Sequence, residues 1–298
     1  MTRMLRHLGL SLLALFCAVP ARAAIDLTDD LGYAVHLDAP ARRIVSLAPH
    51  LTELIFAAGA GDALVAGVDY SDYPAAAKRL PSVGSYTNAD LEAVVSHRPD
   101  LVIGWRSGNP PTQIDRLRAL GIPVYMNESR DLAAVAHTLR QIGQLAGTGT
   151  SAEAAAQQFE ARERALRDRY AGKPSVGVFY EIWNQPLMTI NGAHLISAVI
   201  RLCGGHNVFA SLDLLAPKIG TEAVLVADPE TIVASGMGES RPEWLDAWRQ
   251  WPQLTAVRRD NLFFIPPELI QRHTPRILDG AQQLCEQLDS ARQRRPAP

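Results

Sequence analysis

The residues with the clearest potential for chemistry in this 298-residue sequence are aromatic side chains in loops. Tyr70 lies in a polar loop and Tyr86 in a turn. Trp105 and Trp183 each follow closely on an apolar run typical of a buried strand. Open α/β sheets bind ligands just beyond the carboxyl ends of their strands, and flat rings with one polar edge suit a large planar ligand there. Any single ring could instead pack between two domains, but four in such loops favour a binding cleft.

Recognisable catalytic motifs do not occur in the sequence. It contains no G-x-S-x-G, H-E-x-x-H, P-loop or dinucleotide-binding glycine pattern. The histidines are never spaced as a pair of metal ligands, so we expect each to be structural or exposed and predict no metal site. The sequence therefore favours a binding protein over an enzyme. An exported α/β enzyme whose site escapes motif search is the alternative from another class.

The elements that must position the aromatic residues alternate between short β-branched apolar runs and helical patterns. This alternation predicts βα units around largely parallel sheets. Between the two sets of units lies 151–170, whose apolar residues recur at helical spacing and which Gly172 and Pro174 end. The predicted strands are 43–47, 100–104, 121–126, 175–180, 230–234 and 261–265, and the predicted shorter helices are 52–58, 91–96, 111–120 and 132–145.

This order of elements predicts an α/β protein of two Rossmann-like lobes with mostly parallel sheets. We place the first lobe at 24–148, one long interlobe helix at 149–172 and the second lobe at 173–298, with the ligand cleft between the lobes. A weak internal similarity supports two related lobes. The segments that begin at Glu92 and Glu222 each continue with a short apolar helix, a proline seven residues on, an acid and a strand. Chance similarity between generic helix–Pro–strand units is the alternative.

The first 23 residues have the three parts of a secretory signal peptide. Arg3 and Arg6 make the start basic, 8–19 is an uncharged apolar run, and Ala-Arg-Ala at 21–23 closes it. The run is short for a permanent membrane-spanning helix. We therefore expect 1–23 to be cleaved and 275 residues to be exported. A buried N-terminal helix is the alternative.

Cleavage of the signal peptide resolves the odd number of cysteines. It removes Cys17 and leaves Cys203 and Cys285 in the exported protein. Outside the reducing cytosol we expect these two residues to form one disulfide, with two free thiols as the alternative.

Charge and hydropathy narrow the range of partners. The chain has 29 Lys and Arg against 31 Asp and Glu, a formal net charge of −2. A near-neutral chain has no general affinity for polyanions, so we predict no nucleic-acid partner. Beyond 1–23 no uncharged stretch reaches transmembrane length, and we expect a soluble monomer.

Several motifs in this sequence resemble those of a known class of binding proteins. The opening 43–49 (RIVSLAP), followed by Thr-Glu-Leu at 52–54, resembles the start of the metal-chelate class of periplasmic substrate-binding proteins. This class supplies ABC importers of vitamin B12, haem and siderophores. Segments 69–74, 105–109 and 272–276, together with the surroundings of both exported cysteines, are similar to its cobalamin-binding branch. The resemblance extends from about residue 41 to residue 288.

The resemblance implies a fold and a set of site residues. In this class one rigid helix joins two α/β lobes, and the ligand lies in the cleft between them. It also implies a disulfide between Cys203 and Cys285. The ligand-binding residues that it implies are Tyr70, Tyr86 and Trp105 from the first lobe, and Trp183, Glu268, Leu269, Ile270, Gln271 and Arg272 from the second.

The resemblance further implies a periplasmic protein that captures cobalamin as cargo, without a cofactor, and delivers it to the permease of an ABC importer in the inner membrane. Glu92 and Glu222 correspond to the glutamates that dock on permease arginines in this class. Haem, cobinamide and iron–siderophores are the alternative cargoes. Haem would use a Tyr or His axial ligand, for which Tyr70, Tyr86 and His273 are the candidates.

Overall fold

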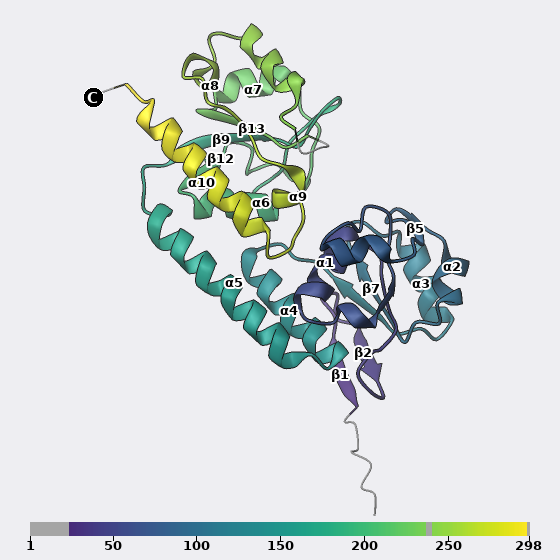
Figure 1. The fold of residues 1–298 in the computed structure, drawn as a ribbon. Helices are drawn as coiled ribbons and strands as arrows, with labels where there is room; N and C mark the ends of the chain where they lie inside the picture. Colours follow the sequence, from purple (N-terminus) through teal and green to yellow (C-terminus); the bar gives the residue numbers. More distant parts are fainter. Residues whose placement is uncertain (1–23, 237–239, 297–298) are drawn as a thin grey trace, which may run out of the picture.

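The computed structural model describes residues 24–236 and 240–296, and it forms two α/β lobes, each with a parallel sheet (Figure 1). The predicted fold class is therefore confirmed. The predicted signal peptide, 1–23, lies outside the described residues. Within the described ranges, no helix combines the length and the apolar character needed to cross a membrane.

The first lobe is built on a sheet in the order β4-β3-β7-β8, with every pair parallel. Its central strands are apolar and buried because helices cover both faces of the sheet. An antiparallel hairpin, β1–β2, precedes the sheet. The strands are β1 Ile25–Thr28, β2 Ala34–Leu37, β3 Ile44–Ser46, β4 Leu64–Ala66, β5 Gly84–Ser85, β6 Asn88–Ala89, β7 Leu101–Trp105 and β8 Val124–Asn127; the helices are α1 Pro49–Ala57, α2 Leu91–Ser96, α3 Pro111–Ala119 and α4 Leu132–Ala146, with 3-10 turns Gly61–Ala63 and Ala75–Arg79.

The second lobe repeats this plan with the strand order β12-β9-β13-β14, again all parallel. Strand β9 is buried along its whole length, as expected for a central strand. The strands are β9 Val176–Glu181, β10 Trp183–Asn184, β11 Leu187–Met188, β12 Gly205–Asn207, β13 Thr231–Ala234 and β14 Leu262–Phe264; the helices are α6 Leu195–Leu202, α7 Thr221–Ala227, α8 Thr255–Arg258, α9 Pro267–Ile270 and α10 Ile277–Gln293, with a 3-10 stretch Glu243–Gln250.

The two sheets share one strand order when their strands are numbered along each lobe: second, first, third, fourth. This common order supports the internal similarity seen in the sequence. Helix α2, which carries Glu92, directly precedes β7, and α7, which carries Glu222, directly precedes β13. In chain order, β7 and β13 are each the third strand of the four-stranded sheet in their lobe, so the two glutamates occupy equivalent places.

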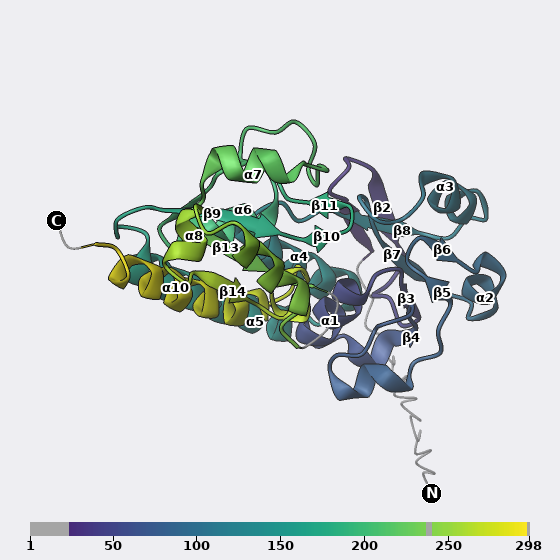
Figure 2. The ribbon, with the colours of Figure 1, turned by 90° about the horizontal axis from the view of Figure 1, so that it is seen from above.

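Helix α5, Gly149–Tyr170, connects the lobes and begins two residues before the predicted Ser151. Its buried face includes Ala152, Ala156 and Phe159, which join a core cluster shared by both lobes. Arg140 of α4 reinforces the contact through ion pairs with two glutamates of α5, at 2.7 Å and 2.6 Å. Helix α10 runs alongside α5 (Figures 1 and 2). Because α5 packs on α4 and α10, it forms a stiff connection between the lobes.

The predicted disulfide is confirmed. Cys203, just after α6, is bonded to Cys285 in α10, and their Cα atoms lie 4.6 Å apart. Both cysteines are fully buried in the core. The bond therefore ties the C-terminal helix to the second lobe.

The sequence analysis did not predict several elements that the structure contains. The three-residue edge strands β4 and β12 were missed, although β3 and β14, which are equally short, lie within the predicted runs 43–47 and 261–265. The amphipathic helices α6 and α10 were also missed. Each buries an apolar face in the second lobe, and the helical spacing of its apolar residues was the signal that could have found it.

Candidate functional site

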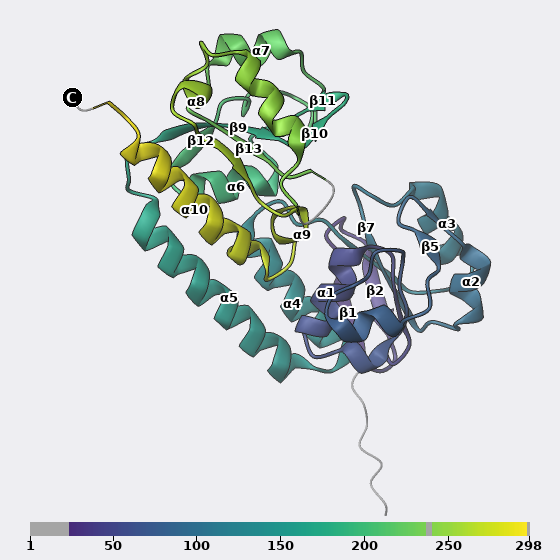
Figure 3. The same cartoon turned by 45° about the horizontal axis from the view of Figure 1, so that its top comes forward.

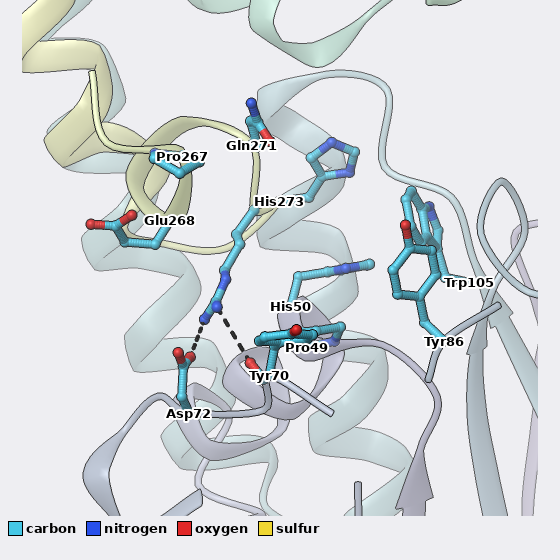
Figure 4. A pocket seen from close by; sticks show the side chains of 11 residues that line it. Pro49, His50, Tyr70, Asp72, Tyr86, Trp105, Pro267, Glu268, Gln271 and His273 are labelled. Atoms are coloured by element: carbon cyan, nitrogen blue, oxygen red, sulfur yellow. Dashed lines mark hydrogen bonds and ion pairs between the residues drawn. The ribbon is translucent and has the colours of Figure 1, made fainter. Parts of the chain in front are cut away.

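A cavity of about 390 Å³ opens between the lobes (Figure 4). Its first-lobe side comes from the start of α1 and from loops after β4, β5 and β7, and its second-lobe side from α9 and the segment that follows it. The lining residues are Pro49, His50, Tyr70, Asp72, Tyr86, Trp105, Pro267, Glu268, Gln271, Arg272 and His273.

The first-lobe wall of this cavity is aromatic. Tyr70 is 80% exposed and has a φ of 63°, a left-handed backbone conformation that non-glycine residues adopt rarely. The ring of Tyr86 lies 5.8 Å from that of Trp105, centroid to centroid. Together these residues offer flat faces to a ligand between the lobes.

Buried Asn109 holds the aromatic wall in place. Its side-chain oxygen accepts a hydrogen bond from the backbone N–H of Trp105 at 2.6 Å, and its amide donates to the carbonyls of Leu47 and Tyr86 at 2.9 Å and 2.7 Å. A Cβ on Gly108 would overlap the Trp105 ring, so only glycine fits at that position. The loop 105–109 is therefore built around the Trp105 side chain.

The second-lobe wall is polar and reaches across to the first lobe. The Arg272 guanidinium donates a hydrogen bond to Asp72 at 2.6 Å and to the backbone carbonyl of Tyr70 at 3.3 Å (Figure 4). Burial alone would raise the pKa of Asp72, but the hydrogen bond and charge of Arg272 outweigh it and lower that pKa. This ion pair closes one side of the cavity.

A second contact between the lobes supports the segment that forms the polar wall. Arg276 forms two hydrogen bonds with the carboxylate of Glu53, at 2.8 Å and 2.7 Å, and its guanidinium lies 3.8 Å from the centroid of the Tyr73 ring. Glu53 is almost fully buried, and such a paired fork geometry fixes orientation well. The contact anchors the segment that carries Arg272.

A smaller cavity of about 250 Å³ adjoins the first, and the two share Tyr86, Trp105, Gln271 and His273. Ile182 and His194 of the second lobe line only the smaller one. The cleft is thus one hollow with two chambers that meet at Trp105 and His273. The remaining residues of the smaller chamber are Ser107, Glu128, Ser129, Arg130, Ala193, Leu195 and Leu215.

Three histidines of the described chain meet where the chambers join. The ring centroid of His273 lies 5.6 Å from that of His50 and 6.1 Å from that of His194. Burial, with the charge of Arg272, lowers the pKa of His50 to about 3, and burial lowers that of His194 to about 4. Burial also lowers the pKa of His273. All three rings are therefore neutral at neutral pH.

Some of the buried polar atoms that have no hydrogen-bond partner among the described residues belong to side chains that line this cleft. They include Nε2 of His50, Nε1 of Trp105, Nε2 of Gln271 and Nδ1 of His273. Buried polar groups in native proteins almost always have partners, so these side chains have hydrogen-bonding capacity that the described chain leaves unused. Among the described residues, no group of three or more His, Cys, Asp or Glu side chains is arranged to hold a metal ion.

The structure brings together most, but not all, of the predicted ligand-binding residues. Tyr70, Tyr86, Trp105, Glu268, Gln271 and Arg272 line the larger chamber. Three predicted residues line neither of the two chambers formed by the described chain: Trp183, Leu269 and Ile270. Their side chains make contacts in a hairpin or in the protein core instead.

The reasons for these three exceptions are local. The indole N–H of Trp183 donates to the carbonyl of Gln185 at 2.7 Å within the β10–β11 hairpin, and the preceding residue, Ile182, lines the cleft instead. Ile270 is fully buried in the core, and Leu269 packs against the same core. In the one-turn helix α9, successive side chains point in different directions, so a continuous segment cannot line a cavity with every residue.

Sequence reasoning missed several residues of the cleft, among them His50, Asp72 and His194, and it named His273 only as a candidate haem ligand. Asp72 and His273 lie inside the motifs 69–74 and 272–276 that the sequence analysis singled out, and His50 directly follows the opening motif 43–49. Their position in or beside those motifs was the available signal. His194 lies outside these motifs, and its contact with His273 is set by packing within the second lobe, where it caps α6.

Comparison with known proteins agrees with this architecture. Residues 44–269 match the sequence family described as periplasmic binding protein, and the chain belongs to that family. It is 36% identical over 253 residues to the vitamin B12-binding protein of Vibrio cholerae, which covers 85% of this chain and 91% of the relative. It is 39% identical over 251 residues to the vitamin B12-binding protein of Yersinia pestis, covering 84% of this chain and 87% of the relative.

Solved structures show the same fold. The crystal structure of the periplasmic vitamin B12 binding protein BtuF of Vibrio cholerae superimposes with a TM-score of 0.78, at 36% identity, covering 85% of this chain and 98% of that chain. The periplasmic heme-binding protein RhuT from Roseiflexus gives a TM-score of 0.74 at 25% identity, covering 84% and 99% of the two chains.

Proposed function

We propose that this protein captures cobalamin in the cleft between its lobes and delivers it to an ABC importer in the inner membrane. The observation that carries the proposal is the two-chambered cleft, with an aromatic wall on the first lobe and a polar wall on the second. The B12-binding relatives at 36% and 39% identity support this cargo. Cobalamin is bound and released unchanged.

The charges of the cleft favour a corrinoid over haem. Among the described lining residues, Arg272 and Arg130 stand against three carboxylates, those of Asp72, Glu268 and Glu128. Asp72 already pairs with Arg272, and Glu128 lies 3.6 Å from Arg130. Haem carries propionate carboxylates that need free cations, whereas the periphery of a corrin carries neutral amides. Unpartnered polar groups such as Gln271 Nε2 and Trp105 Nε1 suit amides.

Delivery requires a surface that the permease can recognise. Glu92 and Glu222 are exposed on α2 and α7, at the ends of the lobes far from α5 (Figures 1 and 3). Each lies in the first turn of its helix. We propose that these two glutamates pair with basic residues of the permease, one per lobe. Such charges set orientation and encounter rate more than affinity.

The signal peptide belongs to the same proposal. The periplasmic binding protein family implies a periplasmic location. Residues 1–23 supply the export signal, and their removal leaves an N-terminus just before the β1–β2 hairpin.

Isothermal titration of the exported protein with cyanocobalamin tests the cargo. We expect one ligand per chain, with saturation at micromolar concentrations, and recovery of unchanged ligand. Parallel titration with haemin, followed by its visible spectrum, serves as the comparison. Absence of cobalamin binding would refute the proposal, and tighter binding of haemin would replace cobalamin by haem as the cargo.

A further inference from the structure

The ion pair between Arg272 of the second lobe and Asp72 of the first forms part of the wall of the larger chamber. We propose that Asp72 is a specificity-determining residue, which occupies the Arg272 guanidinium and so makes the cleft discriminate against ligands with carboxylates on their periphery. This inference rests on the proposed function, because it takes the ligand to be a macrocycle whose peripheral side chains are neutral amides. It goes further by assigning the choice between amide and carboxylate to one side chain.

Arg272 is the partner that a peripheral carboxylate would need. It is the only lysine or arginine among the described residues that line the larger chamber. His50 and His273 line the same chamber, but burial lowers the pKa of both, so they carry no charge at neutral pH. A guanidinium presents a planar fork of donors that matches a carboxylate, and charge-assisted hydrogen bonds of this kind are strong. A free Arg272 would therefore attract an anionic ligand.

Asp72 already fills this role from the opposite lobe. Its Oδ1 accepts a hydrogen bond from Nη1 of Arg272 at 2.6 Å, and Nη2 of Arg272 donates to the backbone carbonyl of Tyr70 at 3.3 Å (Figure 4). Burial alone would raise the pKa of Asp72, but its bond to Arg272 and the charges of Arg272 and Lys78 lower it, so Asp72 is ionised at neutral pH. A ligand carboxylate must displace this anion or lie beside it, and both cost free energy.

Both partners of the ion pair are held in position by contacts within the protein. The backbone N–H of Asp72 donates to the same Tyr70 carbonyl at 3.0 Å, which fixes the loop that carries the carboxylate. On the other side, the two hydrogen bonds of Arg276 to Glu53 anchor the segment that begins at Arg272. The Arg272 side chain is only 18% exposed, so it has little freedom to turn towards solvent. The pair is therefore set before a ligand arrives.

The other carboxylates of the cleft do not have this relation to the cation. Glu268 lines the larger chamber, but its side chain makes no hydrogen bond or ion pair within the part of the chain that the structure describes. Glu128 belongs to the smaller chamber, where it lies 3.6 Å from Arg130. Among the described lining residues, Asp72 is thus the one carboxylate bonded to Arg272. Glu268 offers a matched control, with the same charge in the same chamber but no bond to Arg272.

Cyanocobalamin and its monocarboxylic acids are ligands that differ by one charge. In each of the b-, d- and e-acids, one peripheral propionamide is replaced by a propionate, with almost no change in size. The wild type should bind at least one of these acids about tenfold more weakly than cyanocobalamin, since an added charge beside an ionised pair is unfavourable. Isothermal titration at pH 7 gives, for each isomer, the ratio of the dissociation constant of the acid to that of cyanocobalamin. If every acid binds as tightly as cyanocobalamin, the inference is wrong.

The variant Asp72→Asn tests the assignment. Its amide oxygen can still accept from Arg272, but the negative charge is gone, so Arg272 can pair with a ligand carboxylate. For the isomer that the wild type binds most weakly, this variant should lower the ratio about tenfold. The Asp72 side chain is half exposed, so we expect the variant to fold as the wild type does, and urea titration checks this. An unchanged ratio in the folded variant would overturn the inference.

The control variant Glu268→Gln removes the same charge from the same chamber but leaves the pair of Arg272 and Asp72 intact. It should lower the ratio less than about threefold. An equal fall in both variants would mean that the total charge of the chamber sets the selectivity, and would overturn the inference. Tighter binding of cyanocobalamin itself in Asp72→Asn, with dicyanocobinamide unaffected, would show that Arg272 meets the nucleotide phosphate, and it would overturn the inference as well.

A haem arm separates this inference from the proposed function. If cyanocobalamin binds and the ratio does not fall in Asp72→Asn, the inference is wrong and the proposed function stands. If no corrinoid binds but haemin does, the proposed cargo is wrong. The inference then stands only if Asp72→Asn tightens the binding of haemin about tenfold relative to its dimethyl ester, which lacks both propionate charges. If neither corrinoids nor haemin bind, both proposals are overturned.

Discussion

The two lobes of this protein share one sheet topology but contribute different walls to the cleft. The first lobe presents Tyr70, Tyr86 and Trp105, held by Asn109. The second presents polar side chains such as Gln271 and bears the cross-lobe cations. A common strand order puts the loops in equivalent places, but residue type decides what each loop does there.

The lobes also differ in how they are stabilised. The second lobe is cross-linked by the disulfide between Cys203 and Cys285, whereas 24–148 contains no cysteine. The second lobe also contains a buried acid, Glu181, which accepts a hydrogen bond from Nε1 of Trp248 at 2.8 Å. The lobes can therefore be perturbed separately, and four predictions use this, from the largest expected effect to the smallest.

Removal of the disulfide should have the largest effect. The bridge spans 82 residues, and a loop of this length constrains the unfolded chain enough to account for about 4 kcal/mol. The double variant Cys203→Ser/Cys285→Ser should lose about that much free energy of unfolding in urea titration. If the lobes unfold in separate steps, only the second-lobe transition should move. An unchanged urea midpoint would contradict the prediction.

The buried acid gives the second lobe a distinct pH dependence. Burial raises the pKa of Glu181 to about 7 from an ordinary value of 4.5, and the hydrogen bond from Trp248 only partly offsets this. Because the folded-state pKa is raised, the stability from this group is fully present below pH 4.5 and is lost as pH rises through 7.

The variant Glu181→Gln tests this dependence. It should gain about 3 kcal/mol relative to the wild type between pH 4 and pH 8, since its amide does not titrate and its oxygen still accepts from Trp248. Urea titrations of both proteins across this range measure the difference. The lowered pKa of His194 makes the folded state more stable as pH rises, but this contribution is the same in both proteins and cancels in the difference between them. A pH-independent difference would contradict the raised pKa.

The two tryptophans that follow strands in the sequence allow a matched test of the walls. Trp105→Ala should weaken cobalamin binding about thirtyfold, or about 2 kcal/mol, because it removes an aromatic face of both chambers. Trp183→Ala should change affinity less than about threefold, since its ring lies in the β10–β11 hairpin. Isothermal titration measures both, and equal losses would show that the second lobe also has an aromatic wall.

Reversing the charge of one of the two exposed glutamates should have the smallest effect of the four changes. Glu92→Lys or Glu222→Lys should each reduce cobalamin uptake by intact cells about tenfold, while cobalamin binding by the purified protein is unchanged, since both residues are exposed and line neither chamber of the cleft. The double variant should be more impaired than either. If one glutamate alone carries the effect, docking is asymmetric between the lobes.

The sequence predicted the central strands well because each is a short, fully apolar run between turn residues, as in β7 and β9. The edge strands β8 and β14 were predicted in the same way, whereas the edge strands β4 and β12 were missed, and β10 and β11 have only two residues each, too few to give a pattern. The same limit explains the ligand-binding residues. Trp105 follows a predictable strand, whereas the burial of Ile270 depends on how α9 packs on the second lobe.

What the sequence by itself determined are the two lobes, the long helix, the disulfide partners and the aromatic loops, since each rests on local pattern or on cysteine number. Only the tertiary structure decided that His50, His194 and His273 meet, and that Arg272 and Arg276 bind carboxylates of the other lobe. These contacts join residues up to 223 positions apart. Their geometry follows from how α5 orients one lobe on the other, and no local pattern encodes that orientation.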